Sequence, residues 1–208
     1  MRTYTKVDQY LDSLLFQIYA QPEDEGHTRW AQESIDFLAG SCAHPVTSVL
    51  DAGCGEGFCQ PMFEEKGMAY TGIALRGDVE NAVSKGRNVL SMDFSFLDFP
   101  DGSFHLVYSR HSLEHSPMPL LTLMEWKRVS AKYVALVLPA VEHWTYVGRN
   151  HYFVLHPEQW ENLFDIVGLK IEVKRIKKEV MRPNKEDRRE EYADPPPVEV
   201  EYWYLLSK

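Results

Sequence analysis

The sequence predicts an α/β fold with a doubly wound sheet, and two features of the chain support this. Apolar segments of strand length alternate with stretches long enough for a crossover helix. The first of these segments breaks directly into a glycine-rich loop, and ligands of open α/β sheets bind at such strand ends. The candidate strands are residues 46–50, 69–74, 87–91, 104–109 and 132–138.

Helices are expected both before and after this strand region in the sequence. Residues 7–20 and 28–39 carry apolar side chains at close to helical spacing, which predicts two N-terminal helices. Residues 157–167 predict a further helix, because Pro157 suits a first helical turn and Gly168 suits a helix end.

The C-terminal part of the chain predicts a hairpin. Residues 171–175 and 198–204 alternate in polarity, as strands do, and residues 181–197 between them are rich in charge and proline. Such a segment cannot form a core and predicts a long exposed connection. We therefore expect one domain over residues 1–208, with an N-terminal helical cap over 1–45 and an α/β core over 46–208.

Composition narrows the classes of molecule that the protein is expected to bind. The 208-residue chain has a net charge of −9 and a pI near 5.4. No positive field would attract nucleic acid or an anionic membrane, so small-molecule substrates are favoured. No apolar run has the length of a signal peptide or a membrane span, which predicts a cytoplasmic protein. Cys42, Cys54 and Cys59 form no disulfide or zinc pattern and are expected to be reduced packing residues. The oligomeric state is not predicted.

Residues 51–57 read Asp-Ala-Gly-Cys-Gly-Glu-Gly and form the glycine loop. Small residues let the backbone turn sharply and let a ligand approach it closely, and a helix starting near Gly57 would offer free N–H groups. A dinucleotide fingerprint would place its third glycine one residue later, so the match to that motif is poor.

An acidic residue, any residue, glycine, any residue and glycine directly after a strand resembles motif I of the class I S-adenosylmethionine-dependent methyltransferases. Asp51, Gly53 and Gly55 occupy these positions. Later segments are similar to the small-molecule branch of this family, of types 11 and 23. The resemblance implies S-adenosyl-L-methionine as the cofactor and a Rossmann-like seven-stranded sheet of order 3-2-1-4-5-7-6, with the last strand antiparallel.

The resemblance also implies a set of cofactor contacts. Asp51 would hold the amino group, directly or through water, and Asp93 matches the acidic residue that contacts the adenine amino group. Asp93 has an open alternative as a turn cap, and Phe94 beside it could stack near the base. The implied cofactor-binding residues are Asp51, Gly53, Cys54, Gly55, Ala74, Leu75, Asp93, Phe94, Ser109 and Arg110.

One position departs from the family pattern. Ala74 stands where the family usually places an acidic residue that accepts both ribose hydroxyls. Loss of such a contact costs ~1.5–3 kcal/mol, or roughly one to two decades of cofactor affinity. Asp78 or Glu80 could reach back in its place. The alternative is a catalytically weak or inactive methyltransferase-like binding protein.

Histidine and aromatic residues are found where the methyl acceptor is expected to bind. His111 follows the fourth candidate strand and His151 precedes the helix over 157–167, and these two are the candidate catalytic bases. The candidate substrate-binding residues are His143, Tyr146 and Tyr152, although a loop rich in such residues can also simply pack against the core.

A metal site is not expected from the sequence. His111 and His115 lie four residues apart with Glu114 between them, and would share one face of a helix. The order differs from that of a zinc-protease motif and no third ligand is evident, so metal is predicted to be absent. For His115 a capping or packing role is favoured.

These observations favour O- or N-methylation of a small-molecule or sugar-like acceptor. A nucleic-acid or protein methyltransferase would need a basic patch, for which Lys174, Arg175, Lys177 and Lys178 are available. Alternate residues of a strand face opposite ways, so a solvated edge strand is the favoured interpretation.

Overall fold

The computed structural model describes residues 4–15, 25–141, 150–180 and 198–208. In chain order its elements are α1 (Thr5–Leu15), α2 (Glu25–Gly40), β1 (Ser48–Ala52), α3 (Gln60–Glu64), β2 (Ala69–Ala74), α4 (Gly77–Ser84), β3 (Val89–Ser91), β4 (Phe104–Arg110), the short 3-10 helix η1 (Leu113–His115), α5 (Pro119–Val129), β5 (Ser130–Pro139), α6 (Pro157–Val167), β6 (Lys170–Val180) and β7 (Val198–Ser207).

The seven strands form one sheet in the order β3-β2-β1-β4-β5-β7-β6, which confirms the predicted order. The first five strands in the chain pair in parallel, and β7 is antiparallel to both of its neighbours, β5 and β6. The strand order reverses between β1 and β4, where ligands of open α/β sheets bind.

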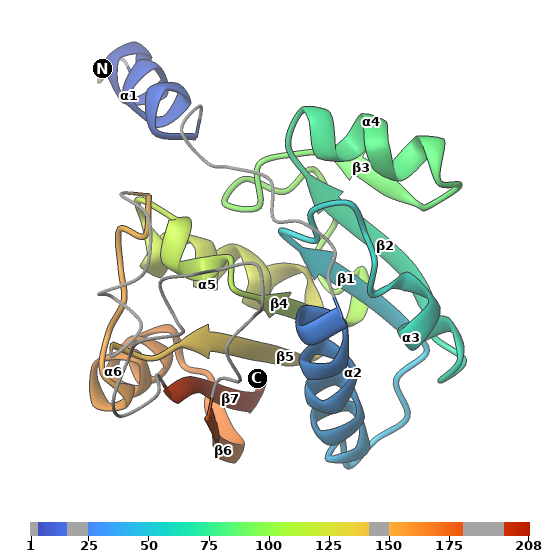
Figure 1. The fold of residues 1–208 in the computed structure, drawn as a ribbon. Coiled ribbons are helices and arrows are strands. Elements are labelled where there is room, and N and C mark those ends of the chain that lie inside the picture. The colour runs from blue at the N-terminus through green and yellow to red at the C-terminus, as the bar shows by residue number, and fades with distance from the viewer. Residues whose placement is uncertain (1–3, 16–24, 142–149, 181–197) are drawn as a thin grey trace, which may run out of the picture.

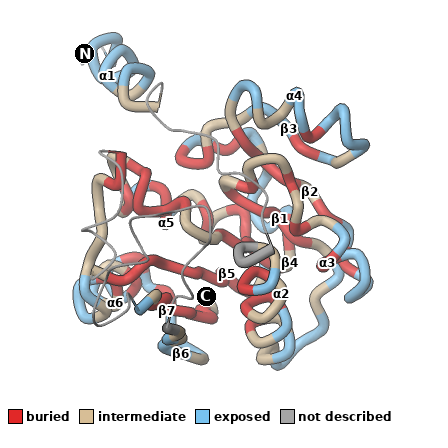
Figure 2. The backbone as a smooth tube through the Cα atoms, viewed as in Figure 1, coloured by how far each residue is buried: buried red, intermediate tan, exposed pale blue. Residues whose placement is uncertain are grey.

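Helices cover both faces of the sheet (Figure 1). One face packs on α5 and α6, which bury side chains such as Trp126 and Phe164, and the other packs on α2 and α3 through side chains such as Ile35 and Phe63. The central strands are buried along their length in Figure 2, because each supplies alternate residues to the two layers. In contrast α1 buries no side chain.

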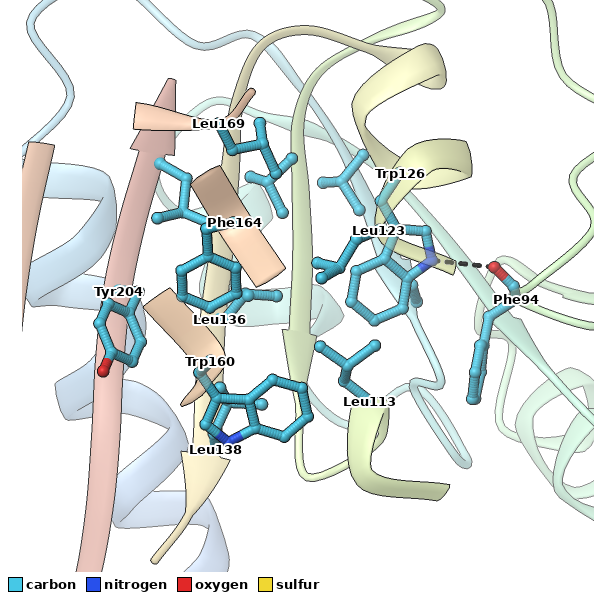
Figure 3. Packing of buried hydrophobic residues seen from close by; sticks show 14 of the residues in the cluster. Phe94, Leu113, Leu123, Trp126, Leu136, Leu138, Trp160, Phe164, Leu169 and Tyr204 are labelled. Atoms are coloured by element: carbon cyan, nitrogen blue, oxygen red, sulfur yellow. Dashed lines mark hydrogen bonds between the residues drawn. The ribbon is translucent and has the colours of Figure 1, made fainter. Parts of the chain in front are cut away.

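Two tryptophans anchor the α5 and α6 layer, as Figure 3 shows. Trp126 donates its indole N–H to the backbone carbonyl of Phe94 over 2.9 Å, and its ring lies 5.8 Å from the Phe94 ring. Trp160 packs beside Phe164, whose ring meets Tyr204 of β7 edge-on. This layer therefore fixes the segment after β3 as well as the sheet.

Several predicted elements differ in length from the observed ones. The third strand is shorter than the predicted 87–91, and the helix expected near Gly57 begins at Gln60 because Gly57 has a positive φ of 73° and lies in a turn. The end of the helix predicted over 7–20 and the connection predicted over 181–197 lie outside the described residues.

The close packing of Gly53 leads to a test. A Cβ there would lie 2.4 Å from the Ser112 Oγ and 2.6 Å from its Cβ, whereas a Cβ on Gly55 would meet nothing within 4 Å. Both glycines have positive φ. We expect Gly53→Ala to lower the free energy of unfolding by about 2–4 kcal/mol and Gly55→Ala by about 1 kcal/mol, measured by urea denaturation.

The double variant Gly53→Ala/Ser112→Gly removes both clashing atoms. It should be more stable than the sum of the two single changes predicts, by on the order of 1 kcal/mol. Equal losses at Gly53 and Gly55 would show that backbone strain alone, and not the contact with Ser112, requires glycine at position 53.

Candidate functional site

The glycine loop is held by the neighbouring strand β2. The backbone N–H groups of Gly53 and Cys54 both donate to the carbonyl of Ile73 over 3.0 Å. Positive φ values at Gly53, Gly55 and Gly57 let the chain fold back at each of these positions. The loop is therefore a fixed cradle at the carboxyl end of β1.

Asp51 lies beneath this cradle and is only 2% exposed. Its Oδ2 accepts a hydrogen bond from the Tyr70 hydroxyl over 2.9 Å. Burial raises the pKa of Asp51 to about 7, against the opposing effect of the Tyr70 hydrogen bond. The predicted ligand for a cofactor amino group therefore changes charge close to neutral pH.

The end of β2 lacks an acidic group, as the sequence indicated. Ala74 is buried there and Leu75 is partly buried, and α4 begins two residues later. Asp78, in the first turn of α4, is partly buried, and both burial and the nearby charge of Glu56 raise its pKa. Glu80 is exposed. Of the two carboxylates proposed to replace the missing one, Asp78 lies on the side of the glycine loop.

Asp93 and Phe94 follow β3. Asp93 accepts the backbone N–H of Ser95 at its Oδ1 over 2.8 Å, which is the turn-cap arrangement, and burial raises its pKa. Phe94 is buried against Trp126, and its ring lies 3.5 Å from the position of a Cβ on Gly53. The adenine contacts of both residues stay predictions.

Two serines connect the end of β4 to the glycine loop. Ser109 donates its hydroxyl to the carbonyl of Ala52 over 2.9 Å, and Ser112 donates to the carbonyl of Gly53 over 3.0 Å. Ser109 was predicted to contact the cofactor, and this contact stays a prediction. Its hydroxyl holds the backbone just before the loop. Ser112 was not predicted, since a serine among several gives no signal in the sequence.

Arg110 and His111 are held by a buried carboxylate of β7. The Glu201 Oε1 lies 2.7 Å from Arg110 Nη2 and 2.9 Å from His111 Nε2, and its Oε2 accepts the indole N–H of Trp203 over 2.7 Å. Burial by itself would raise the pKa of Glu201, but the charges of Arg110 and His111 and these hydrogen bonds lower it to about 2. The two predicted site residues thus share one partner.

A second polar cluster lies just beyond, on η1 and the segment before α6. Glu114 is 0%, His115 9% and His151 5% exposed, and their ligand-type atoms all lie within 4.8 Å of one another. Burial raises the pKa of Glu114 to about 8, and burial together with the neighbouring His151 lowers the pKa of His115 to about 4. No local pattern in the sequence indicated that Glu114 would face His151.

This cluster is fixed through the backbone. The carbonyl of Glu114 accepts the N–H groups of Tyr152 and Phe153 over 2.8 and 3.0 Å, so the two segments are locked together. The Tyr152 hydroxyl donates to the carbonyl of Leu14 in α1 over 3.2 Å. Tyr152, a predicted substrate ligand, therefore joins the cluster to the N-terminal helix.

The structure separates two histidines that were predicted to share a helix face, and it does not describe two of the predicted substrate ligands. His111 and His115 do not share a helix face, because His111 has a φ of 49° and η1 spans only Leu113–His115. The predicted substrate ligands His143 and Tyr146 lie outside the described residues.

An open apolar groove of about 670 Å³ lies beside the polar cluster, between the start of α5 and α6. Phe153 and Met118, close in sequence to His151 and His115, form part of its wall. Its lining residues are Met118, Pro119, Leu120, Leu121, Phe153, Leu155, Glu158, Gln159, Asn162 and Leu163.

Three cations of β6 have partners within the molecule. Lys174 pairs with Glu161 over 2.6 Å, and Lys177 pairs with Glu33 of α2. The Arg175 guanidinium lies 4.6 Å from the centre of the Phe37 ring. That β6 does not contact nucleic acid stays a prediction. Among the described helices, none is both long and apolar enough to cross a membrane.

Comparisons with known proteins give the same assignment as the geometry. Residues 50–138 match a family model described as a methyltransferase domain. A S-adenosylmethionine-dependent methyltransferase from Archaeoglobus fulgidus superimposes with a TM-score of 0.66 at 17% identity, over 100% of both chains. One from Methanosarcina mazei gives 0.64 at 16%, over 83% of this chain and 96% of the other.

A third similar structure, the [4+2]-cyclase SpnF, gives a TM-score of 0.65 at 16% identity, over 99% of this chain and 93% of the other. No curated protein matches the sequence. The matched segment runs from the glycine loop to the end of β5. With its sheet order of β3-β2-β1-β4-β5-β7-β6, the chain has the fold of these S-adenosylmethionine-dependent methyltransferases, and its residues 50–138 are similar to a methyltransferase domain.

Proposed function

We propose that this protein transfers the methyl group of S-adenosylmethionine to an oxygen or nitrogen of a small-molecule or sugar-like acceptor. The observation that carries the proposal is the hydrogen bond from Ser112 to Gly53, which joins the glycine loop to the segment bearing Glu114 and His115. A cofactor on the loop and an acceptor at the cluster would then lie at one edge of the sheet.

The protein would contribute mainly geometry to this reaction. The bound cofactor supplies a methyl group already activated on a sulfonium, so the enzyme must align the acceptor with it. Alignment can account for ~7–11 kcal/mol of the barrier in favourable cases. The loop held to Ile73 and the cluster locked by the Glu114 carbonyl are both rigid enough for this.

His151 is the better candidate for a general base toward a hydroxyl acceptor. His111 Nε2 lies 2.9 Å from the Glu201 carboxylate, which already engages that ring nitrogen. His151 lies in the segment that leads through Phe153 into the apolar groove. A small acceptor with an apolar body would fit a groove of that size and wall composition.

The fold alone does not decide the chemistry, since one similar structure is a cyclase. The buried Ala74 in place of a ribose-binding carboxylate favours the alternative, a binding protein with weak or no catalysis. Calorimetry with S-adenosylhomocysteine tests the cofactor binding that the methyltransferase proposal requires, because absence of heat at millimolar ligand would contradict cofactor binding of any kind.

The position of Asp78 predicts which residue compensates for Ala74. We expect Asp78→Ala to weaken S-adenosylhomocysteine binding by roughly one to two decades, since a charge-assisted hydrogen bond is lost. Glu80→Ala, a matched change on the exposed side of the same turn, should leave the affinity unchanged. Equal affinities for wild type and both variants in calorimetry would remove Asp78 from the cofactor site.

The raised pKa of Asp51 predicts how cofactor affinity depends on pH. Below about pH 7 the carboxyl holds a proton that must leave before it can accept the cofactor ammonium. Affinity should therefore fall roughly tenfold per pH unit as the pH drops below 7, and level off above it. The cofactor amino group, with a pKa of about 7.7–8.0, stays charged over this window.

Two variants isolate this effect in calorimetry between pH 5.5 and 7.5. Asp51→Asn should bind more weakly and without this pH dependence. Tyr70→Phe removes the hydrogen bond that favours the ionised carboxylate, so its midpoint should move to higher pH. An unchanged profile in Asp51→Asn would assign the titration to another group.

Methyl transfer can be measured as S-adenosylhomocysteine release with a panel of small hydroxyl and amine acceptors. For a hydroxyl acceptor we expect His151→Gln to lower kcat by ~10²–10⁴-fold while cofactor affinity stays the same. His44→Gln, on an exposed loop, is the matched control. Full turnover in His151→Gln would exclude His151 as the base, and no turnover with any acceptor would favour the binding protein.

A further inference from the structure

Three side chains with metal-ligand chemistry meet after β4. Glu114 and His115 come from η1, and His151 comes from the segment 36 residues further along the chain. One ligand-type atom from each lies within 4.8 Å of the others, and all three side chains are almost fully buried. The sequence predicted no metal site because no third ligand was evident. The fold brings His151 next to Glu114 and His115 as a third candidate ligand.

The carboxylate of Glu114 is the strongest indication. It is 0% exposed, and neither oxygen makes a hydrogen bond in the described part of the chain. The Nε2 of His151 lies 4.0 Å from Oε1. A buried carboxyl group whose oxygens make no hydrogen bond is costly in either protonation state, so such groups in proteins are hydrogen-bonded, paired or bound to a metal ion.

The orientation of His115 fits a ligand. Its Nδ1 lies 3.0 Å from the carbonyl of Asn150, which fixes the ring and places Nε2 on its far side. A backbone carbonyl on one ring nitrogen is the usual way in which proteins orient a metal-binding histidine through the other. The His151 ring lies 4.3 Å from the His115 ring, centre to centre.

The segments that carry the ligands are also fixed before any ion binds. Tyr152 and Phe153, directly after His151, donate their backbone N–H groups to the carbonyl of Glu114. Only side-chain rotation is then needed to close the site. Ligand atoms around a four-coordinate zinc ion lie roughly 3.3 Å apart, given metal–ligand bonds of ~2.0–2.1 Å. The 4.0 Å between His151 and Glu114 would have to shorten by less than about 1 Å.

We propose that Glu114, His115 and His151 form a binding site for a divalent transition-metal ion such as Zn²⁺ or Co²⁺. Two imidazole nitrogens and one carboxylate oxygen favour such ions over Mg²⁺ or Ca²⁺, which prefer oxygen ligands throughout. Three protein ligands leave one position open on the metal. That this position takes a hydroxyl or amine of the acceptor rests on the proposed function, whereas the site itself does not. With the ion bound, His151 is a ligand, and it acts as a general base only in the metal-free protein.

The test uses the full chain, stripped with a chelator and free of cofactor and acceptor. Titration with Co²⁺ should give visible absorption bands of a four- or five-coordinate ion at one equivalent, and Zn²⁺ should displace them. Zn²⁺ should also raise the Tm of the wild type. Because neither cofactor nor acceptor is present, this result stands whether or not methyl transfer is ever observed.

Variants identify the ligands. Glu114→Gln and His151→Gln should each weaken binding 100-fold or more and abolish the Tm rise, while His44→Gln, an exposed histidine, should bind as wild type does. Glu114→Gln keeps the shape of the side chain, so the metal-free variant should melt close to wild type. An equal Tm would exclude misfolding as the cause of weaker metal binding.

Several results would contradict the proposed metal site. Failure of the wild type to bind Zn²⁺ or Co²⁺ at tens of micromolar would overturn the proposal, as would equal binding by Glu114→Gln. Loss of binding in His44→Gln would indicate an adventitious surface site. A preference for Mg²⁺ over both transition metals would contradict the assignment of the two nitrogen ligands.

Discussion

The candidate site depends on one buried ion pair, that of Arg110 at the end of β4 with Glu201 at the beginning of the buried part of β7. A buried carboxylate is costly unless its lone pairs are used, and Arg110, His111 and Trp203 together engage both oxygens of Glu201. This fixes where β4 stops and how the chain leaves it. Everything that follows β4, including Ser112 and the polar cluster, takes its position from there.

The inserted antiparallel strand makes this pair possible. Because β7 lies between β5 and β6, its residue Glu201 lies opposite Pro139 at the carboxyl end of β5, one strand away from Arg110. The same sheet edge carries the glycine loop of β1. The order of the last strands thus places a carboxylate of the C-terminal hairpin at the same edge as the glycine loop.

Much of the fold could be predicted from the sequence because its signals are local. The glycine loop, the strand-length apolar runs and Gly168 after the last helix each reflect a few neighbouring residues. The polar networks could not be predicted, since Arg110 and Glu201 lie 91 residues apart. The spacing of His111 and His115 suggested one helix face, but a positive φ at His111 leaves only one short turn of helix, and this turns Glu114 and His115 toward His151.

The position of β7 also has a consequence for folding. Strand β6 precedes β7 in the chain but lies outside it in the sheet, so within the described sheet β6 is attached to β5 only through β7. The pairing of β7 with β5 joins segments that lie far apart in the chain. Such non-local pairing is slow compared with helix formation. Glu201 reaches Arg110 in the same step that completes the sheet. A partly folded molecule that lacks β7 therefore also lacks the ordered end of β4, so binding competence and complete folding are acquired together.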